Sequence, residues 1–181
     1  MSDLKLSKVF YLEEFEKLLK KLKIPRNEIC IIGSSVFALM GIKNNGDIEF
    51  VASKKIRKKI NRIADEGNLA THVIKKLEFF EFGKIIFSEN IHSSRYDRYQ
   101  DLGFTDEDLI FNPENHIEIN GFKFLRPEIA FSLKILDRRE KDIEHIRIIE
   151  NSGLFNNKMW DWNKVVLVEP WNKKITLLNC H

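Results

Sequence analysis

Apolar residues recur at helical spacing in two stretches of the chain. Between residues 9 and 22 they return every three or four positions and Pro25 follows, which predicts an amphipathic helix that ends before this proline. A second pattern begins after Pro127 and reaches Gly153, which predicts one long helix closed by this glycine. Residues 54–63 are rich in lysine and arginine and predict a helix with a strongly basic exposed face.

Short apolar or alternating runs between these helices have the length of β-strands. They occupy residues 28–32, 47–52, 72–74, 79–82, 85–87, 116–119 and 122–125. The last two runs flank Asn120-Gly121, a pair that strongly favours a tight hairpin turn, and Gly83-Lys84 suits a second turn. Residues 160–178 have the pattern of a terminal hairpin. A further short helix is expected after the Gly33-Ser34-Ser35 turn.

Composition narrows the class of protein. With 181 residues, of which 43% are hydrophobic, the chain has the size and apolar content of one compact domain. A net charge of +3 is too small to favour a nucleic-acid partner, although it is compatible with a phosphate-bearing substrate. The two cysteines, Cys30 and Cys180, form no disulfide framework or metal-binding spacing. These features, and apolar runs no longer than strands, predict a cytoplasmic protein without membrane association.

Two carboxylates and a glycine turn are the strongest candidates for chemistry. Asp47 and Glu49 alternate along a predicted strand, so both side chains face the same way with α-carbons roughly 6 to 7 Å apart. Oxygen ligands at that separation suit Mg²⁺, which binds through one or two carboxylates while phosphate oxygens complete its shell. The turn Gly33-Ser34-Ser35 precedes a predicted helix, where backbone N–H groups and hydroxyls favour a phosphate. Ser35 is also a candidate helix cap.

These features resemble the signature of the DNA polymerase β-like nucleotidyltransferases. Residues 31–51, IIGSSVFALMGIKNNGDIEFV, combine a glycine-serine turn, a short helix and an acid-x-acid strand, as that signature does. Residues 126–150, RPEIAFSLKILDRREKDIEHIRIIE, are similar to a helical segment of small stand-alone members. The residues that match the lysine and the later arginine-x-lysine-aspartate run of that segment are Lys134, Arg139, Lys141 and Asp142.

The resemblance implies an α/β (α+β) fold with a mixed β-sheet flanked by helices, in one domain spanning residues 1–181. The core would cover about residues 8–125, and a C-terminal helix and terminal hairpin would follow in about residues 126–181. The implied activity is magnesium-dependent transfer of a nucleotidyl group from a nucleoside triphosphate to a small phosphorylated or hydroxylated acceptor. Residues 101–124 are similar to chains of envelope polysaccharide synthesis, which would be one setting for this activity.

The resemblance also assigns roles to residues. Asp47 and Glu49 would hold the metal and serve as the catalytic pair, while Gly33, Ser34 and Ser35 would bind phosphate. Lys134 and Lys141 would assist in phosphate binding; on one continuous helix, Lys134, Arg138 and Lys141 would form a basic stripe. Lys134 is expected to point toward Asp47, with Ile129, Leu133 and Leu136 facing the core.

The sequence departs from the family pattern at two positions. Glu49 stands where the family usually has aspartate, and the third carboxylate of the family has no clear counterpart. The candidates for that position are Glu78, Glu81, Glu89, Glu118 and His92. Two alternatives therefore stay open: a toxin-like member that modifies tRNA or protein, and a catalytically inactive module that binds nucleotides.

Overall fold

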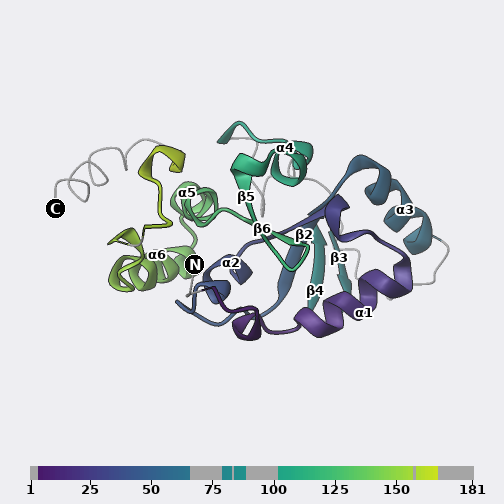
Figure 1. Ribbon diagram of the computed structural model, residues 1–181, viewed down its shortest axis with the longest axis horizontal. Coiled ribbons are helices and arrows are strands. Elements are labelled where there is room, and N and C mark those ends of the chain that lie inside the picture. Colours follow the sequence, from purple (N-terminus) through teal and green to yellow (C-terminus); the bar gives the residue numbers. More distant parts are fainter. Residues whose placement is uncertain (1–3, 66–78, 83, 89–101, 157, 167–181) are drawn as a thin grey trace.

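The computed structural model describes residues 4–65, 79–82, 84–88, 102–156 and 158–166 (Figure 1). The strands are β1 (Ile29–Ile32), β2 (Ile48–Ala52), β3 (Phe79–Phe82), β4 (Ile85–Ser88), β5 (His116–Ile119) and β6 (Phe122–Leu125). The α-helices are α1 (Leu12–Leu22), α2 (Ser35–Leu39), α3 (Lys54–Asp65), α4 (Asp106–Phe111), α5 (Pro127–Asp137) and α6 (Glu140–Asn151). Short 3-10 helices cover Leu6–Lys8, Arg26–Glu28, Pro113–Asn115, Leu154–Asn156 and Trp162–Lys164. This arrangement confirms the predicted combination of a sheet with flanking helices.

The described strands form one mixed sheet in the order β3-β4-β2-β1-β6-β5. Strand β1 pairs antiparallel with β2 and parallel with β6. Because β1 and β6 run the same way, their carboxyl ends lie at the same edge of the sheet, and β2 begins at that edge. The chain segments around these three strand ends are therefore brought together, although they are far apart in the sequence.

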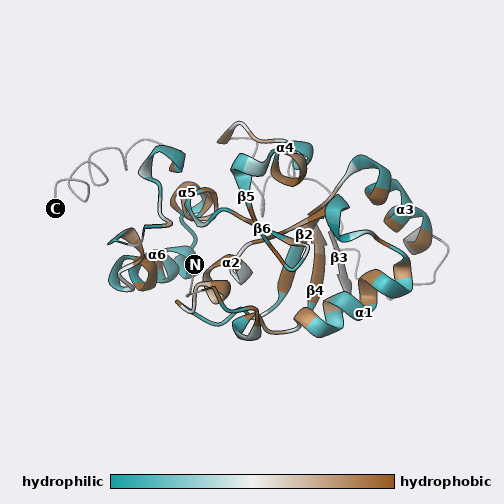
Figure 2. Ribbon diagram, in the orientation of Figure 1, coloured by the Kyte–Doolittle hydropathy of each residue, from teal (hydrophilic) through white to brown (hydrophobic). Residues whose placement is uncertain are grey.

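Both faces of the sheet are covered, because alternate side chains of each strand enter different hydrophobic clusters. Ile29 and Ile31 of β1 pack in the cluster that includes α1 and α3. Cys30 and Ile32 pack on the opposite side, with α4, α5 and α6. Figure 2 shows β4 as apolar and helices such as α1 and α3 as mixed apolar and polar, as expected for helices that bury one face.

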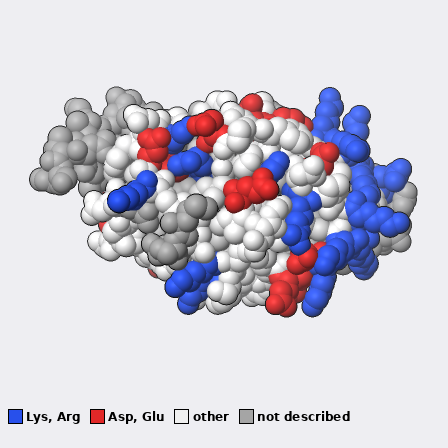
Figure 3. All heavy atoms as spheres, in the orientation of Figure 1, with Lys and Arg blue, Asp and Glu red and all other residues white. Residues whose placement is uncertain are grey.

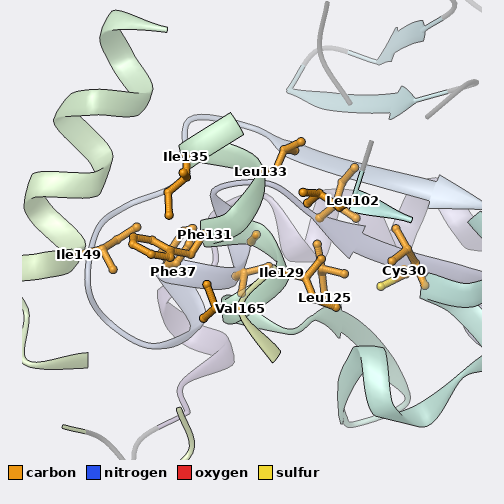
Figure 4. Close-up of a cluster of buried hydrophobic side chains, with 14 of the residues drawn as sticks. Cys30, Phe37, Leu102, Leu125, Ile129, Phe131, Leu133, Ile135, Ile149 and Val165 are labelled. Atoms are coloured by element: carbon orange, nitrogen blue, oxygen red, sulfur yellow. The ribbon is translucent and has the colours of Figure 1, made fainter. Parts of the chain in front are cut away.

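The cluster on the α4, α5 and α6 side of the sheet includes Ile129, Phe131, Leu133 and Ile135 of α5 (Figure 4). Phe131 is 1% exposed and its ring lies 5.5 Å from that of Trp160. Phe155 approaches Trp160 and Trp162, with ring centroids 4.9 Å away in each case. These tryptophans are thus packing residues that hold the chain after α6 against α5.

Several local predictions are confirmed. Strands β5 and β6 form the expected hairpin, and Asn120 and Gly121 have positive φ angles of 50° and 75°, as its tight turn requires. Strands β3 and β4 pair antiparallel, with Phe82 opposite Ile85. The predicted strand at 72–74 and Gly83 lie outside the described residues.

The predicted single long helix after Pro127 is wrong. Helix α5 ends at Asp137, Arg138 adopts a left-handed conformation with φ of 52°, and α6 begins at Glu140. The predicted stripe of Lys134, Arg138 and Lys141 therefore does not exist, because the two lysines belong to different helices. The break lets α6 fold back against α5, and the packing of the two helices stabilises the break.

The predicted terminal hairpin is also not found in residues 160–166, the part of it that the structure describes. Within residues 158–166, Trp162–Lys164 form a 3-10 helix, and the Asp161 side chain accepts a hydrogen bond from the Asn163 amide. The remainder of the predicted hairpin lies outside the described residues. None of the described helices is long and apolar enough to cross a membrane.

Candidate functional site

A cavity of the described structure lies at the sheet edge where β1 and β6 end and β2 begins. Its volume is about 310 Å³. The residues that line it are Gly33, Ser34, Lys43, Gly46, Asp47, Glu49, Ala130, Leu133, Lys134, Arg139, Lys141, Asp142 and His145. The structure thus brings the predicted pair Asp47 and Glu49 together with the Gly33-Ser34 turn, Lys134 and Lys141 in one cavity.

The sheet places the two carboxylates beside the glycine turn. Glu49 is paired with Ile32, the last residue of β1, so the turn that follows Ile32 lies next to the Glu49 side chain. Gly33 has φ of +67°, and a Cβ atom built on it would lie 2.6 Å from Oε2 of Glu49. Glycine at this position therefore serves both the backbone conformation and the close approach of the Glu49 carboxylate.

The structure does not give Ser35 the role of helix cap that the sequence suggested for it. Ser34, not Ser35, is the N-cap residue of α2, and its side chain makes no capping hydrogen bond. Ser35 is 1% exposed, and its Oγ donates to the backbone carbonyl of Asp47 at 3.2 Å. The Asn45 side-chain amide donates to the same carbonyl at 2.8 Å. Ser35 therefore fixes the backbone of Asp47 and does not line the cavity, since its hydroxyl is used inside the fold.

Cationic side chains from α5, α6 and the loop before β2 surround the carboxylates. Lys134 on α5 is 7% exposed, and its Nζ lies 3.4 Å from Oδ1 of Asp142, a fully buried residue of α6. Arg139 binds Asp142 through both Nε and a terminal nitrogen. Asp142 thus holds two cations in place across the junction of the two helices.

Burial and charge set the pKa values in this network. Burial acts to raise the pKa of Asp142, but hydrogen bonds from Arg139 and the charge of Lys134 outweigh it, so that the pKa lies below its usual value. Burial lowers the pKa of Lys134, and Asp142 opposes this effect only in part. The negative charge of Glu49 acts on both Lys134 and Arg139, which places the acidic and basic halves of the site within electrostatic range.

A second contact chain joins Lys43 to Lys134 through a histidine. Nζ of Lys43 lies 2.6 Å from Nε2 of His145, and Nδ1 of His145 lies 3.1 Å from Nζ of Lys134. Burial and the nearby charge of Lys134 lower the pKa of Lys43 to about 8. Burial and the two lysines lower the pKa of His145 to about 4. The imidazole is therefore uncharged at neutral pH.

The oxygen donors of the cavity fit a divalent cation that is coordinated jointly by the protein and by a phosphate. Asp47 and Glu49 supply two carboxylates, the number typical of Mg²⁺ sites completed by substrate oxygens and water. Among the described residues, no group of three or more histidine, cysteine, aspartate or glutamate side chains could hold a metal ion. A cation bound here would thus depend on oxygen atoms from the ligand.

The expected third carboxylate is absent from the strand beside β2. The β4 residue paired with Glu49 is Ile86, an apolar side chain. Glu118 lies on β5, three strands from β2 in the sheet order, so it does not meet the carboxylate pair. Glu81 is on β3, opposite Ile86. The other candidates, Glu78, Glu89 and His92, lie outside the described residues.

Lys43, Arg139, Asp142 and His145 were not among the site residues predicted from the sequence. Arg139 and Asp142 belong to the matched helical segment, and His145 lies three positions after Asp142, a spacing that puts both on one helix face. That spacing was the available signal for His145. Lys43 lies in the loop between α2 and β2 and has no such signal, because its approach to His145 depends on the packing of α6.

The strongly basic helix α3 does not contribute to this cavity. It follows the carboxyl end of β2, whereas Asp47 precedes the opposite end of that strand. Figure 3 shows lysine and arginine side chains concentrated at the end of the molecule where α3 lies. Arg57 pairs with Asp106, and Lys59 Nζ donates to the carbonyl of Lys23 at 2.9 Å.

Comparison of the chain with protein-family models, with curated proteins and with solved structures finds no match.

Replacing Gly33 by alanine is expected to lower the free energy of unfolding by about 1–2 kcal/mol, because alanine at positive φ is strained. The added Cβ should also displace the Glu49 carboxylate. Gly41 is a matched control: its φ is +72°, but no atom lies within 4 Å of an added Cβ. Both variants should lose stability in thermal denaturation. Only Gly33→Ala should weaken Mg²⁺-dependent nucleotide binding measured by calorimetry, and an equal effect of both variants would contradict the proximity argument.

Proposed function

We propose that this protein is a magnesium-dependent nucleotidyltransferase that binds a nucleoside triphosphate in the cavity around Asp47 and Glu49. The observation that supports this proposal most directly is the sharing of one cavity by two adjacent carboxylates, a glycine turn and four basic side chains. The four basic residues are Lys43, Lys134, Arg139 and Lys141. The resemblance of residues 31–51 and 126–150 to nucleotidyltransferases points to the same site.

The charges of the cavity are arranged as a metal-bound triphosphate requires. Asp47 and Glu49 would hold the divalent cation, while Lys134, Arg139 and Lys141 lie on the α5 and α6 side, where negatively charged phosphate oxygens would extend. When bound, Mg²⁺ would neutralise phosphate charge and polarise the reacting phosphoryl group. Gly33 lets a phosphate approach the turn without a side chain in the way.

The reacting groups of the proposed transfer are an acceptor hydroxyl or phosphate oxygen, the α-phosphorus of the nucleotide, and the pyrophosphate that leaves. The chain's own contribution would be to orient the triphosphate between the β2 carboxylates and the cations of α5 and α6. Asp142 supports this arrangement from inside the fold, because it fixes both Lys134 and Arg139.

The test is a panel of nucleoside triphosphates and candidate acceptors scored for pyrophosphate release with and without Mg²⁺. Binding of each nucleotide is measured in parallel by titration calorimetry. We expect magnesium-dependent binding of at least one nucleotide and pyrophosphate release that requires both metal and acceptor. The absence of binding for every nucleotide would refute the proposed function.

One observation favours a second candidate, an inactive nucleotide-binding module. Ile86 stands beside Glu49 on β4, where a third carboxylate would be needed to hold a second metal near the acceptor. Such a module would bind nucleotide with Mg²⁺ but release no pyrophosphate with any acceptor. The same panel therefore distinguishes the enzyme from the binding module.

Removing the amine of Lys141 should weaken triphosphate binding more than monophosphate binding. Lys141 is an exposed residue that lines the cavity, so its ammonium acts on the ligand as a point charge. The loss for Lys141→Ala should be about two- to fivefold at low salt and smaller at high salt. Lys55→Ala, an exposed change on α3, is the matched control and should leave both affinities unchanged. Equal losses of affinity for the triphosphate and the monophosphate would mean that the terminal phosphates do not lie near Lys141.

A further inference from the structure

The contact chain Lys43–His145–Lys134 imposes a constraint on protonation. The two lysine amines approach opposite nitrogens of one imidazole ring, at 2.6 Å and 3.1 Å. A lysine ammonium can only donate hydrogen bonds, and a neutral imidazole has one N–H donor and one lone pair. Two ammonium groups would therefore compete for one lone pair, and an imidazolium would offer none. Both contacts can be hydrogen bonds only if one of the two lysines is uncharged.

The surroundings identify Lys43 as the uncharged amine. Lys134 is held as an ammonium by the buried carboxylate of Asp142 at 3.4 Å, and it lies 5.9 Å from the centre of the Phe37 ring. In the described part of the chain, Lys43 has no carboxylate within ion-pair distance.

Charges of both signs act on Lys43 from the elements around it. Lys134 on α5 and Lys141 on α6 oppose its charge, whereas Glu144 on α6 and Asp47 before β2 favour it. Burial of the amine is the largest of the effects that oppose its charge, and the net result is a pKa of about 8. The hydrogen-bond constraint and the charges therefore agree that Lys43 gives up its proton first.

The same constraint fixes the histidine tautomer. With Lys134 charged, Nδ1 of His145 must accept, so the ring proton is on Nε2 and is donated to the neutral amine of Lys43. If Lys134 were the neutral lysine, the proton would be on Nδ1. The tautomer of His145 is thus a direct readout of which lysine is uncharged.

We propose that the cavity takes up one proton when a phosphate-bearing ligand binds, and that Lys43 is the group that receives it. A polyphosphate adds negative charge beside an amine that is neutral in the free protein above about pH 8, and this charge favours the ammonium form. Once protonated, Lys43 can no longer accept from His145, so its N–H groups turn to the phosphate oxygens. By thermodynamic linkage, protonation of Lys43 strengthens phosphate binding by the same factor.

The expected pH dependence follows from this linkage. Below pH 8 Lys43 is already charged, so binding takes up little proton. Above that value the free protein has lost the proton that the complex retains, and affinity should fall about tenfold per pH unit. The inference rests on the proposed function only in requiring that a phosphate ligand occupies this cavity.

The test uses ATP and the full chain without metal, in the presence of a chelator. The pH is about one unit above 8, where most of the free protein has an uncharged Lys43. The phosphates of ATP are fully ionised there, because the last pKa of a phosphate is about 6. Titration calorimetry in several buffers with different ionisation enthalpies gives the number of protons taken up. We expect a value approaching one for the native protein. Lys43→Arg retains a permanent charge and should reduce the uptake to near zero, with a flat affinity across this pH range.

A second measurement examines the free protein. About one unit above pH 8, where Lys43 is uncharged, nitrogen chemical shifts of His145 in isotope-labelled protein should show the neutral Nε2–H tautomer. A proton on Nδ1 would overturn the assignment to Lys43. ATP binding with equal enthalpy in all buffers, or proton uptake that persists in Lys43→Arg, would overturn this inference while leaving the proposed function intact. Failure of ATP to bind under any condition, with or without Mg²⁺, would overturn both.

Discussion

Replacing Asp47 by asparagine is expected to abolish the magnesium-dependent part of nucleotide binding and to reduce pyrophosphate release by about 100-fold or more. The amide retains the shape of the carboxylate but loses the negative charge that a hard cation requires, and its NH2 group faces the metal with a donor. The measurement is titration calorimetry with ATP in the presence and absence of Mg²⁺, together with the release assay.

The fold should survive this substitution. The backbone carbonyl of Asp47 is held by Ser35 and Asn45, whose hydrogen bonds do not involve the Asp47 side chain. Glu118→Gln on β5 is a suitable control, because Glu118 is exposed and away from the carboxylate pair. It should leave Mg²⁺ dependence and melting temperature unchanged. Native Mg²⁺ dependence in Asp47→Asn would move the metal site elsewhere.

Replacing Asp142 by alanine should lower the free energy of unfolding by about 3–5 kcal/mol. The side chain is fully buried and pairs with Lys134 and Arg139, so its removal leaves two cations in the α5–α6 junction without their shared partner. Urea denaturation measures the loss. Glu140→Ala, an exposed change in the first turn of α6, should cost little. A comparably small cost for Asp142→Ala would mean that packing alone holds the two helices together.

The Asp142 interaction should also depend on pH. Because the pKa of Asp142 in the folded protein lies below the ordinary value of 3.8, its contribution is fully present above that pH. It is lost as the pH falls through the folded-state pKa. The stability difference between the native protein and Asp142→Ala should therefore shrink in strongly acidic solution and stay constant near neutral pH.

The sequence predicted those elements whose geometry depends on residues close to one another in the chain. The β5–β6 hairpin follows from the Asn120-Gly121 pair, since these residue types accept the positive φ angles of its turn. The grouping of Gly33, Asp47 and Glu49 was also foreseeable, because one turn, one short helix and one antiparallel strand pair connect them. Both predictions concern short stretches of chain that fold upon themselves.

Features that depend on tertiary packing were not predictable in this way. The break between α5 and α6 occurs at Arg138, a residue without the conformational freedom of glycine, and no proline follows it. The contact of Asp142 with Lys134, eight residues apart in the chain, contributes to its stability and exists only when α6 folds back. The Lys43–His145 contact depends on the same packing, so the sequence pattern of a continuous helix concealed both.

The central position of β1 has a consequence for how the chain acquires its structure. One neighbour, β2, follows β1 closely in the sequence. The other, β6, lies far along the chain and is synthesised much later, since Ile31 of β1 pairs with Phe124. A ribosome-bound chain that ends before β6 would leave one edge of β1 without its partner. Long-range pairing of this kind slows folding, because a large loop must close before the contact forms. Protection from hydrogen exchange of the β1 amides that face β6 should therefore appear late in refolding.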